Sequence, residues 1–215
     1  MRHLAILGAS GHGRVVADVA VQAGWEAVSF FDDGEVDETS LRWPFVGNTD
    51  QLLARRQGYS AAFVAIGNNR IRMEKLELLL SSGLHLPSLV HPATTVDSSV
   101  HISDGVLVCA GVVVNCDVHI GPGVILNTAC SVDHDCVLEA GVHISPGANL
   151  AGGVTCEARA WVGIGAAVCP GVRIGEETIV GAGAAVIDDL PARATAVGVP
   201  ARVLPAFPTQ NGDKC

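Results

Sequence analysis

The chain has few aromatic residues and few charges for its length. Aromatic side chains make up 4% of the 215 residues and charged side chains 16%, whereas 49% of the residues are hydrophobic. Such a hydrophobic content excludes a disordered chain. Because large rings are scarce, the core must be built from small and branched side chains. This favours a regular, closely repeated architecture over an ordinary layered one.

Other features that the sequence lacks narrow the class of protein. No stretch offers about 18 continuous apolar residues and no signal-peptide cleavage pattern follows the N-terminus, so we expect no membrane insertion. The seven cysteines show no C-x-x-C spacing, which favours free thiols in a reducing cytoplasm. The formal net charge of -9 makes nucleic acid an unexpected partner, so any anionic ligand needs a local device such as backbone N–H groups.

A period of six residues organises the second half of the sequence. Steps of six from Val90 to Val186 meet only Val, Ile or Leu, apart from Cys156, and a second apolar column includes Cys130 and Cys136. Hexapeptide repeats are typical of a parallel β-helix, in which the periodic residues point inward and glycines or small polar residues form the corners. We therefore expect these three cysteines to be inert core. The period has no insertion, so no large loop should project.

The first part of the chain follows a different pattern, in which apolar strands alternate with helical spacing. Residues 3–7, 27–33 and 61–69 are predicted strands, and residues 14–24, 48–57 and 70–82 are predicted helices. This alternation predicts a parallel sheet with helices on its faces. We expect a Rossmann-like α/β domain over residues 1–86, a β-helix over 87–204 and a C-terminal tail over 205–215.

Glycine and polar residues follow each predicted strand of the α/β domain. The turn GASGHG, residues 8–13, departs from the dinucleotide fingerprint G-x-G-x-x-G, but a glycine-rich turn into a helix presents N–H groups suited to phosphate. Asp32 and Asp33 end the second strand, and Gly67 and Asn68 follow the third. The carboxyl ends of parallel strands meet at one edge, so these residues together predict a nucleotide site. Each could also be an ordinary turn that binds nothing.

Three titratable residues, Asp133, His134 and Asp135, interrupt the apolar repeat. His134 comes two residues after a core position, so we expect it on an outward corner of a coil. Taken alone, it is either a solvated histidine or a catalytic base. A zinc site with histidines shared between subunits, as in β-helix carbonic anhydrases, is another reading. The remaining histidines of this half are expected at the surface or in subunit contacts; they are His91, His101 and His119.

The motifs GASGHG, FFDD, AIGNNRIR, ILNTACSVDHDC, HISPGA and VGVPAR occur in this order. Together they resemble bacterial nucleotide-sugar acetyltransferases of the PglD/NeuD-like family over nearly the whole chain. The likeness is greatest to the UDP-4-amino-sugar N-acetyltransferases that make N,N'-diacetylbacillosamine precursors. It implies a nucleotide-sugar-binding α/β domain and a left-handed β-helix that forms a homotrimer. Acetyl-CoA would bind between subunits, without a metal.

The resemblance also assigns roles to residues of this chain. His134 matches the general base, and Asp135 matches the acid that orients it or raises its basicity, where the family more often has Glu. The residues that match the nucleotide-sugar side are Ser10, Gly11, His12, Asp32, Asp33, Gly67, Asn68 and Asn127. The residues that match the acetyl-CoA side are His143, Gly152, Ile164 and Ala182.

A coil of 18 residues, implied by the same family, places Gly152 one coil beyond His134 on one corner. We expect glycine there to let a thioester approach the backbone, and its N–H to stabilise the tetrahedral oxyanion. One coil earlier stands Cys116, which we interpret as a corner residue and not as a nucleophile. Trp161 precedes a core position and is expected to pack outward or to touch the cofactor.

The function expected is direct transfer of acetyl from acetyl-CoA to the 4-amino group of a UDP-linked amino-dideoxy sugar, with His134 as base. One alternative keeps the enzyme class and changes the acceptor to a GDP-linked amino sugar or to sialic acid, which would be O-acetylated. A different class is a zinc-dependent hydratase of the carbonic anhydrase type. A non-catalytic, nucleotide-sugar-binding trimer is the remaining reading.

Overall fold

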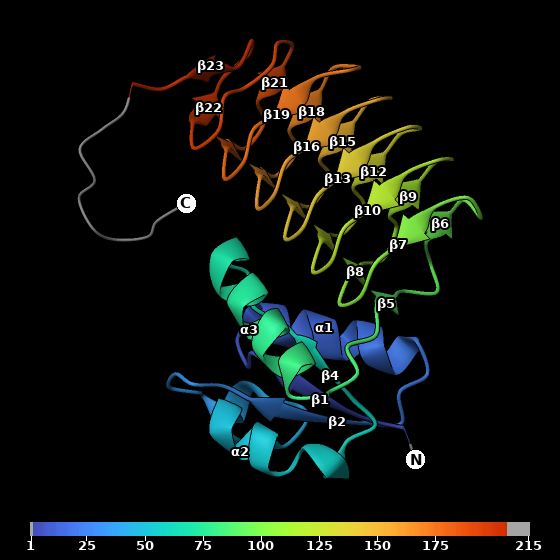
Figure 1. Ribbon diagram of the computed structural model, residues 1–215, viewed down its shortest axis with the longest axis vertical. Helices are drawn as coiled ribbons and strands as arrows, with labels where there is room; N and C mark the ends of the chain where they lie inside the picture. Colours follow the sequence, from blue (N-terminus) through green and yellow to red (C-terminus); the bar gives the residue numbers. More distant parts are fainter. Residues whose placement is uncertain (1, 206–215) are drawn as a thin grey trace.

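The computed structural model describes residues 2–205 and contains an α/β unit followed by a long stack of short strands (Figure 1). The predicted order of two dissimilar halves is confirmed. The predicted tail, residues 205–215, lies outside the described residues except for Pro205. The elements of the α/β unit are β1 (His3–Leu7), α1 (Gly11–Gln22), β2 (Ala27–Phe31), β3 (Phe45–Gly47), α2 (Thr49–Ala54), β4 (Ala61–Val64) and α3 (Asn69–Ser81).

The strands of the α/β unit form one parallel sheet in the order β3-β2-β1-β4. Successive strands can run parallel because helices carry the chain back across the sheet. α1 packs on the face that contains Leu4 and Ile6, whereas α2 and α3 pack on the opposite face. β2 and β4 end at Phe31 and Val64, earlier than the sequence predicts. The polar residues after them therefore lie in loops at the carboxyl edge.

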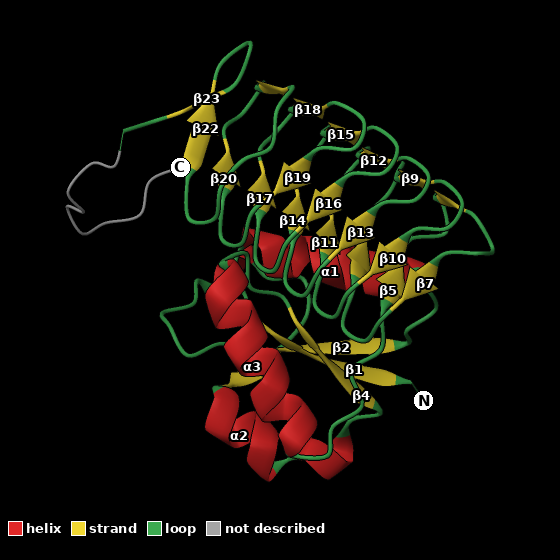
Figure 2. Ribbon diagram, turned by 45° about the horizontal axis from the view of Figure 1, so that its top comes forward, coloured by secondary structure: helices red, strands yellow, loops and turns green. Residues whose placement is uncertain are grey.

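The second half is the predicted left-handed β-helix. From β5 to β21 its strands are two residues long, recur every six residues without an inserted loop, and pair in parallel with the strand 18 residues away (Figure 2), whereas the three-residue β22 and the antiparallel β23 close the stack. Three sheets result, which we call the eight-, six- and five-stranded sheets. The strands are β5 (Leu89–Val90), β6 (Thr95–Val96), β7 (His101–Ile102), β8 (Leu107–Val108), β9 (Val113–Val114), β10 (His119–Ile120), β11 (Ile125–Leu126), β12 (Ser131–Val132), β13 (Val137–Leu138), β14 (His143–Ile144), β15 (Asn149–Leu150), β16 (Thr155–Cys156), β17 (Trp161–Val162), β18 (Ala167–Val168), β19 (Arg173–Ile174), β20 (Ile179–Val180), β21 (Ala185–Val186), β22 (Thr195–Val197) and β23 (Arg202–Val203).

Small apolar side chains fill the β-helix, as the six-residue period predicts. Val132 and Ile144 are both 0% exposed, and Cys130, Cys136 and Cys156 are buried among them. Burial raises the pKa of the Cys130 thiol to about 12, which keeps this thiol protonated and unreactive. Each buried methylene contributes about 0.8 kcal/mol, so a long ladder of valines and isoleucines replaces a core of aromatic rings.

Three corners separate the sheets, and each turns through residues in the left-handed backbone region. Glycine adopts this region without strain, as at Gly123 (φ 65°), and Asp does so at a small cost, as at Asp135 (φ 58°). We name the corners after residues that they contain. They are the His134 corner between the six- and five-stranded sheets (Cys116, His134, Gly152), the α3 corner between the five- and eight-stranded sheets (Gly105, Gly123, Gly141) and the Asn127 corner between the eight- and six-stranded sheets (Asn127, Ile164, Ala182).

The α/β unit covers the eight-stranded sheet of its own chain. The outward side chains Leu107, Ile125 and His143 of that sheet are 0%, 2% and 7% exposed. Figure 2 shows α1 lying along these strands, between them and the sheet of the α/β unit. In a three-sided coil each corner is opposite one sheet, so the His134 corner lies on the side away from the α/β unit.

Three histidines and one tryptophan of the β-helix differ in how far they are exposed to solvent. His91, expected at the surface, is 6% exposed because its Nδ1 accepts a hydrogen bond from the Ala93 N–H at the turn where the β-helix begins. His101 and His119 are exposed on neighbouring strands. Trp161 is half-buried, since it stacks on a neighbouring ring. None of the helices in residues 2–205 is long and apolar enough to cross a lipid bilayer.

Candidate active site

A cavity of about 250 Å³ opens at the carboxyl edge of the sheet in the α/β unit. Four predicted substrate-binding residues line it, namely Ser10, Asp32, Asp33 and Gly67. A second cavity of about 160 Å³ shares Ser10 and Asp32 and is also lined by Gly11. The three strand ends thus meet at one hollow, where open parallel sheets generally bind ligands.

Backbone packing requires glycine at two positions, Gly8 in the turn before α1 and Gly13 in its first turn. A Cβ on Gly8 would lie 2.3 Å from the Ala65 carbonyl oxygen, and one on Gly13 would lie 2.1 Å from the Gly8 oxygen. These contacts account for the spacing of the two glycines without a ligand. The first-turn N–H groups of α1, beginning at Gly11, nonetheless lack helical partners and suit a phosphate group.

Both aspartates at the end of β2 already accept hydrogen bonds from the protein. Asp32 accepts from the Ala9 N–H at 2.7 Å and so ties the loop after β2 to the turn before α1. Asp33 accepts from the N–H and hydroxyl of Thr49 and from the Lys75 ammonium at 2.6 Å. Burial opposes ionisation of Asp33, but these hydrogen bonds outweigh it and lower the pKa of the carboxyl. Lys75 is thus the cation of this cavity.

The other predicted residue at this edge, Asn68, caps a helix. Its side-chain oxygen accepts from the Ile71 N–H at 3.0 Å, so α3 begins at Asn69. The amide oxygen is therefore committed to the helix. Gly67 before it has no atom within 4 Å of a would-be Cβ and leaves open space beside the cavity.

His12 and His143, which the sequence assigns to different ligands, lie near each other between α1 and the eight-stranded sheet. Burial, and then the charge of Arg72, lowers the pKa of His12 to about 4. Burial, Arg72 and His12 together lower the pKa of His143 to about 3. Both rings are therefore neutral at physiological pH. Each keeps one buried ring nitrogen without a partner in the described residues, Nε2 in His12 and Nδ1 in His143.

The contacts of His143 determine its tautomer. The Asn127 amide oxygen accepts from the Thr128 N–H at 2.8 Å, which turns the Asn127 NH2 towards His143 Nε2 at 3.3 Å. Because an amide N–H can only donate, Nε2 accepts and the single ring proton lies on Nδ1. The ring stacks on Trp161, whose Nε1 donates to the Ser145 hydroxyl. His143 is therefore a rigid, neutral donor beside Asn127.

His134 projects from its corner into solvent, and its two acids hold it differently. Its Nδ1 lies 2.7 Å from Asp135 Oδ2, whereas Asp133 accepts from the His134 backbone N–H and from the Asn115 amide. The hydrogen bond to Asp135, and then the charge of Asp133, raise the pKa of His134 above 6.5. With its proton on Nδ1, the neutral ring presents a basic lone pair at Nε2. Asp135 therefore contacts the imidazole ring, whereas Asp133 contacts the backbone of the turn.

Gly152 lies directly against the His134 ring. The Gly153 N–H donates to the His134 carbonyl, which shows that the two corners stack one coil apart. A Cβ on Gly152 would lie 2.5 Å from both Cε1 and Nε2 of the imidazole. Glycine at this position therefore leaves room for the imidazole ring of His134. Cys116, one coil earlier, is an exposed corner residue whose carbonyl accepts from the Asp135 N–H.

The candidate residues of one chain fall on two separate corners. His134 and Gly152 share the His134 corner, whereas Ile164 and Ala182 stand one coil apart on the Asn127 corner, linked by the hydrogen bond from the Gly183 N–H to the Ile164 carbonyl. Ile164 is 61% exposed. Within one chain the α/β unit lies over the eight-stranded sheet, so the fold leaves His134 on the corner away from the residues of that unit.

Arg72 and Lys75 are not among the site residues predicted from the sequence, because only the fold brings them to the site. Both stand in a segment predicted as an ordinary helix, where basic residues usually face solvent. The pairing of Trp161 with His143 has a signal, because these residues are 18 apart and coils stack at that distance. No group of three or more His, Cys, Asp or Glu side chains in residues 2–205 is arranged to hold a metal ion.

Comparison with known proteins agrees with this geometry. Residues 3–79 match the PglD N-terminal domain family. PerB from Caulobacter crescentus, solved with CoA and GDP-perosamine, is 42% identical and superposes with a TM-score of 0.91 over 95% of this chain and 98% of its own. The acetyltransferase domain of PglB from Neisseria gonorrhoeae, solved with acetyl coenzyme A, is 40% identical, with a TM-score of 0.88 over 94% of this chain and 99% of its own.

A third solved structure extends the likeness. WeeI from Acinetobacter baumannii is 30% identical, with a TM-score of 0.85 over 95% of this chain and all (100%) of its own. These similarities span both the α/β unit and the β-helix. The chain therefore belongs to the PglD-like family of acetyl-CoA-dependent sugar N-acetyltransferases.

Proposed function

We propose that this enzyme transfers acetyl from acetyl-CoA to the 4-amino group of a UDP-linked 4-amino-4,6-dideoxy sugar, with His134 as general base. The observation that carries the proposal is the His134–Asp135 pair on an open corner. Asp135 accepts from Nδ1 at 2.7 Å, the ring lies against Gly152, which has no side chain, and His134 is exposed at the corner. A group so placed can take a proton from an acceptor amine that approaches the corner.

The chemistry needs one base and no covalent intermediate on the enzyme. The amine nitrogen attacks the thioester carbonyl, and the adduct carries a positive nitrogen and a negative oxygen. His134 Nε2 takes the nitrogen proton as the C–S bond breaks and CoA leaves as the thiolate, which then takes up a proton. General bases of this kind contribute about 10²–10⁴-fold to the rate. The Gly152 N–H, which has no backbone partner within residues 2–205, is the proposed donor to the oxyanion.

The separation of the candidate residues supports a homotrimer with active sites between subunits. The nucleotide cavity, His143 and Asn127 lie around the covered sheet, and His134 lies on the opposite corner. A second copy is needed to bring a His134 corner against an Asn127 corner. Acetyl-CoA would then run between the copies, along Ile164 and Ala182 on one side and Gly152 on the other. Ser10, Gly11, His12, Asp32, Asp33, Gly67 and Asn68 would hold the nucleotide sugar.

Two nucleotides, UDP and GDP, are candidates for the carrier of the amino sugar. The FFDD and GNN motifs resemble those of the UDP-sugar enzymes, and this supports UDP. PerB, 42% identical to this chain, was solved with GDP-perosamine, which favours a GDP-linked amino sugar as the second candidate. The cavity offers the Lys75 ammonium as a donor to either base, because uracil and guanine both carry a carbonyl oxygen.

One assay tests these alternatives together. Purified enzyme is mixed with acetyl-CoA and a panel of UDP- and GDP-linked 4-amino sugars and sialic acid, and released CoA is followed with a thiol reagent. Transfer to the UDP-linked sugars alone supports the proposal, and transfer to the GDP-linked sugars alone replaces UDP by GDP. Transfer to sialic acid changes the acceptor class. No transfer, with stoichiometric bound zinc and hydration of carbon dioxide, would identify a hydratase instead.

A further inference from the structure

Arg72 is a buried cation that the proposed chemistry does not use. It stands in the second turn of α3, is 1% exposed, and keeps a pKa of about 9 despite the burial that lowers it, so it is charged at neutral pH. No carboxylate in residues 2–205 pairs with it. A charge in such a place persists only when hydrogen bonds replace its water.

All five N–H donors of Arg72 meet oxygen atoms, and the acceptors belong to both halves of the molecule. Nη1 donates to the carbonyls of Ile66 and Gly67 at 3.0 and 3.1 Å. Nε donates to the Gly123 carbonyl at 2.7 Å and Nη2 to the Gly141 carbonyl at 2.6 Å. The remaining bond, from Nη2, reaches the side-chain oxygen of Asn69. One guanidinium therefore joins the loop after β4 to two successive coils of the β-helix.

These acceptors stand next to the two parts of the candidate site. Ile66 and Gly67 line the nucleotide cavity. In the β-helix, Gly141 precedes His143 by two residues, and Gly123 precedes Asn127 by four. Arg72 thus connects the wall of the nucleotide cavity to the coils that carry the neutral histidine and its amide partner.

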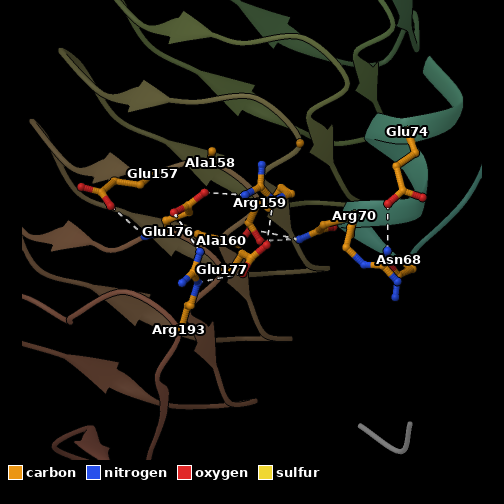
Figure 3. A network of polar contacts seen from close by, with 12 residues as sticks. Asn68, Arg70, Glu74, Glu157, Ala158, Arg159, Ala160, Glu176, Glu177 and Arg193 are labelled. Atoms are coloured by element: carbon orange, nitrogen blue, oxygen red, sulfur yellow. Dashed lines mark hydrogen bonds and ion pairs between the residues drawn. The ribbon is translucent and has the colours of Figure 1, made fainter. Parts of the chain in front are cut away.

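Residues of α3 next to Arg72 pack directly against the α3 corner. A Cβ on Gly123 would lie 2.8 Å from the sulfur of Met73, and one on Gly105 would lie 2.6 Å from Leu76, so these side chains of α3 pack directly on the glycine backbone. Beside Arg72, Asn69 donates to the carbonyls of Arg159 and Ala160. Figure 3 shows the next coils of this corner close to α3, where charged side chains replace the glycines.

We propose that Arg72 is a positioning residue for the acetyl transfer: it sets the register between the nucleotide loop, Ile66–Gly67, and the β-helix coils that carry Asn127 and His143. The inference rests on the proposed function, because register matters only if both parts hold one reacting pair. Arg72 contacts neither reactant and acts through the groups that it aligns. A displacement of about 1 Å between reacting groups can cost about 10²-fold in rate.

The test compares Arg72→Met with the matched control Arg70→Met in the full chain. Arg70 lies two residues away on α3, is exposed, and pairs with Glu74 on the same helix (Figure 3). For each variant, kcat and KM are measured on the active sugar, and binding of UDP, GDP and CoA is measured separately by calorimetry. We expect kcat of Arg72→Met to fall about 10²-fold, with nucleotide and CoA affinities unchanged. Arg70→Met should behave as wild type.

Arg72→Lys keeps the charge but has three donors for five acceptors, so its kcat should lie between those of Arg72→Met and wild type. A folded Arg72→Met with wild-type kcat overturns the inference, and so does a loss of kcat matched by equal losses of nucleotide and CoA binding. If Arg72→Met does not fold, Asn69→Ala replaces it and must lower kcat without changing either affinity. A wild-type enzyme that acetylates no sugar in the panel removes the proposed function and this inference with it.

Discussion

At the scale of single residues, His134 differs from the other histidines in what its ring contacts. An acid holds its Nδ1, a glycine leaves space at its Nε2, and the ring is open to solvent. His143 is the opposite case, because burial keeps it neutral and an amide fixes its tautomer. The same side chain is therefore the proposed base in one place and a neutral hydrogen-bond donor in the other.

Replacing the base should remove most of the activity. We expect His134→Ala to lower kcat by at least about 10²-fold, since a general base contributes about 10²–10⁴-fold. His85→Ala is the control, because His85 is an exposed histidine far along the chain from the corner. Steady-state kinetics at saturating acetyl-CoA measures both. Wild-type activity in His134→Ala would contradict the mechanism whatever the acceptor is.

The acid beside the base should set the pH dependence. The hydrogen bond that His134 Nδ1 donates to Asp135 is the largest cause of the raised pKa of His134. A base acts only when neutral, so kcat/KM should rise with pH through a midpoint above 6.5, the ordinary histidine value. In Asp135→Asn the pKa of His134 falls, and the midpoint should move to lower pH while the maximal rate drops. Asn tolerates the left-handed backbone at this position, so a profile with an unmoved midpoint counts against Asp135 as the partner.

At the scale of elements, the α3 corner shows how one helix is seated on a repeating structure. The glycines of this corner lie under α3, and the column continues as Arg159 and Glu177 beyond it, in a ladder of ion pairs with Glu176 and Arg193 (Figure 3). Such exposed pairs contribute little, about 0–1 kcal/mol each. These ion pairs all lie within the β-helix, so α3 contacts the corner through packing of Met73 and Leu76 on the glycines and through the hydrogen bonds of Asn69 and Arg72.

A pair of glycine substitutions separates this packing from backbone strain. Gly123 and Gly165 have the same φ of 65°, but a Cβ meets Met73 at the first and nothing within 4 Å at the second. Gly165→Ala should lower the free energy of unfolding by about 1–2 kcal/mol through the left-handed backbone alone. Gly123→Ala should cost about 1–3 kcal/mol more through overpacking. Urea unfolding measures both, and equal losses would show that α3 does not press on the corner.

At the scale of the whole molecule, one chain holds the parts of a site without assembling them. The α/β unit covers one sheet of the prism, and this places the nucleotide cavity on the side away from the His134 corner. The chain mass is 22.1 kDa, so the proposed trimer predicts three times that value by light scattering. A monomer that is fully active would contradict a shared site.

Mixed trimers test the sharing directly. We expect His134→Ala and Asn127→Ala to be weakly active alone and to regain activity when coexpressed with different tags and purified as mixed trimers. In either mixture, one interface joins an intact His134 to an intact Asn127 of the neighbouring copy. If both residues act within one chain, mixing restores nothing. Remixing separately purified and unexchanged trimers provides the control.

The prediction from sequence succeeded where a local rule repeats. The inward positions recur every six residues, so periodicity alone gave the β-helix, its corners and the outward position of His134. The α/β unit followed from alternating strands and helices, and the family likeness supplied roles for the residues of both halves. The short strand β3 was missed, because Phe45–Gly47 has only three residues and no alternation.

The sequence by itself thus determined the coil, the two halves and the corner position of His134. Only the tertiary structure decided that Arg72 is buried, that His12 and His143 are neighbours, and that Gly152 accommodates the imidazole. The physical reason is the separation in sequence between the residues that each feature involves. The six-residue period is visible within a single coil. The hydrogen bonds from Arg72 to the carbonyls of Gly123 and Gly141, in contrast, join residues 51 and 69 positions apart. Such contacts depend on how α3 packs against a corner, and they produce no repeating pattern in the sequence.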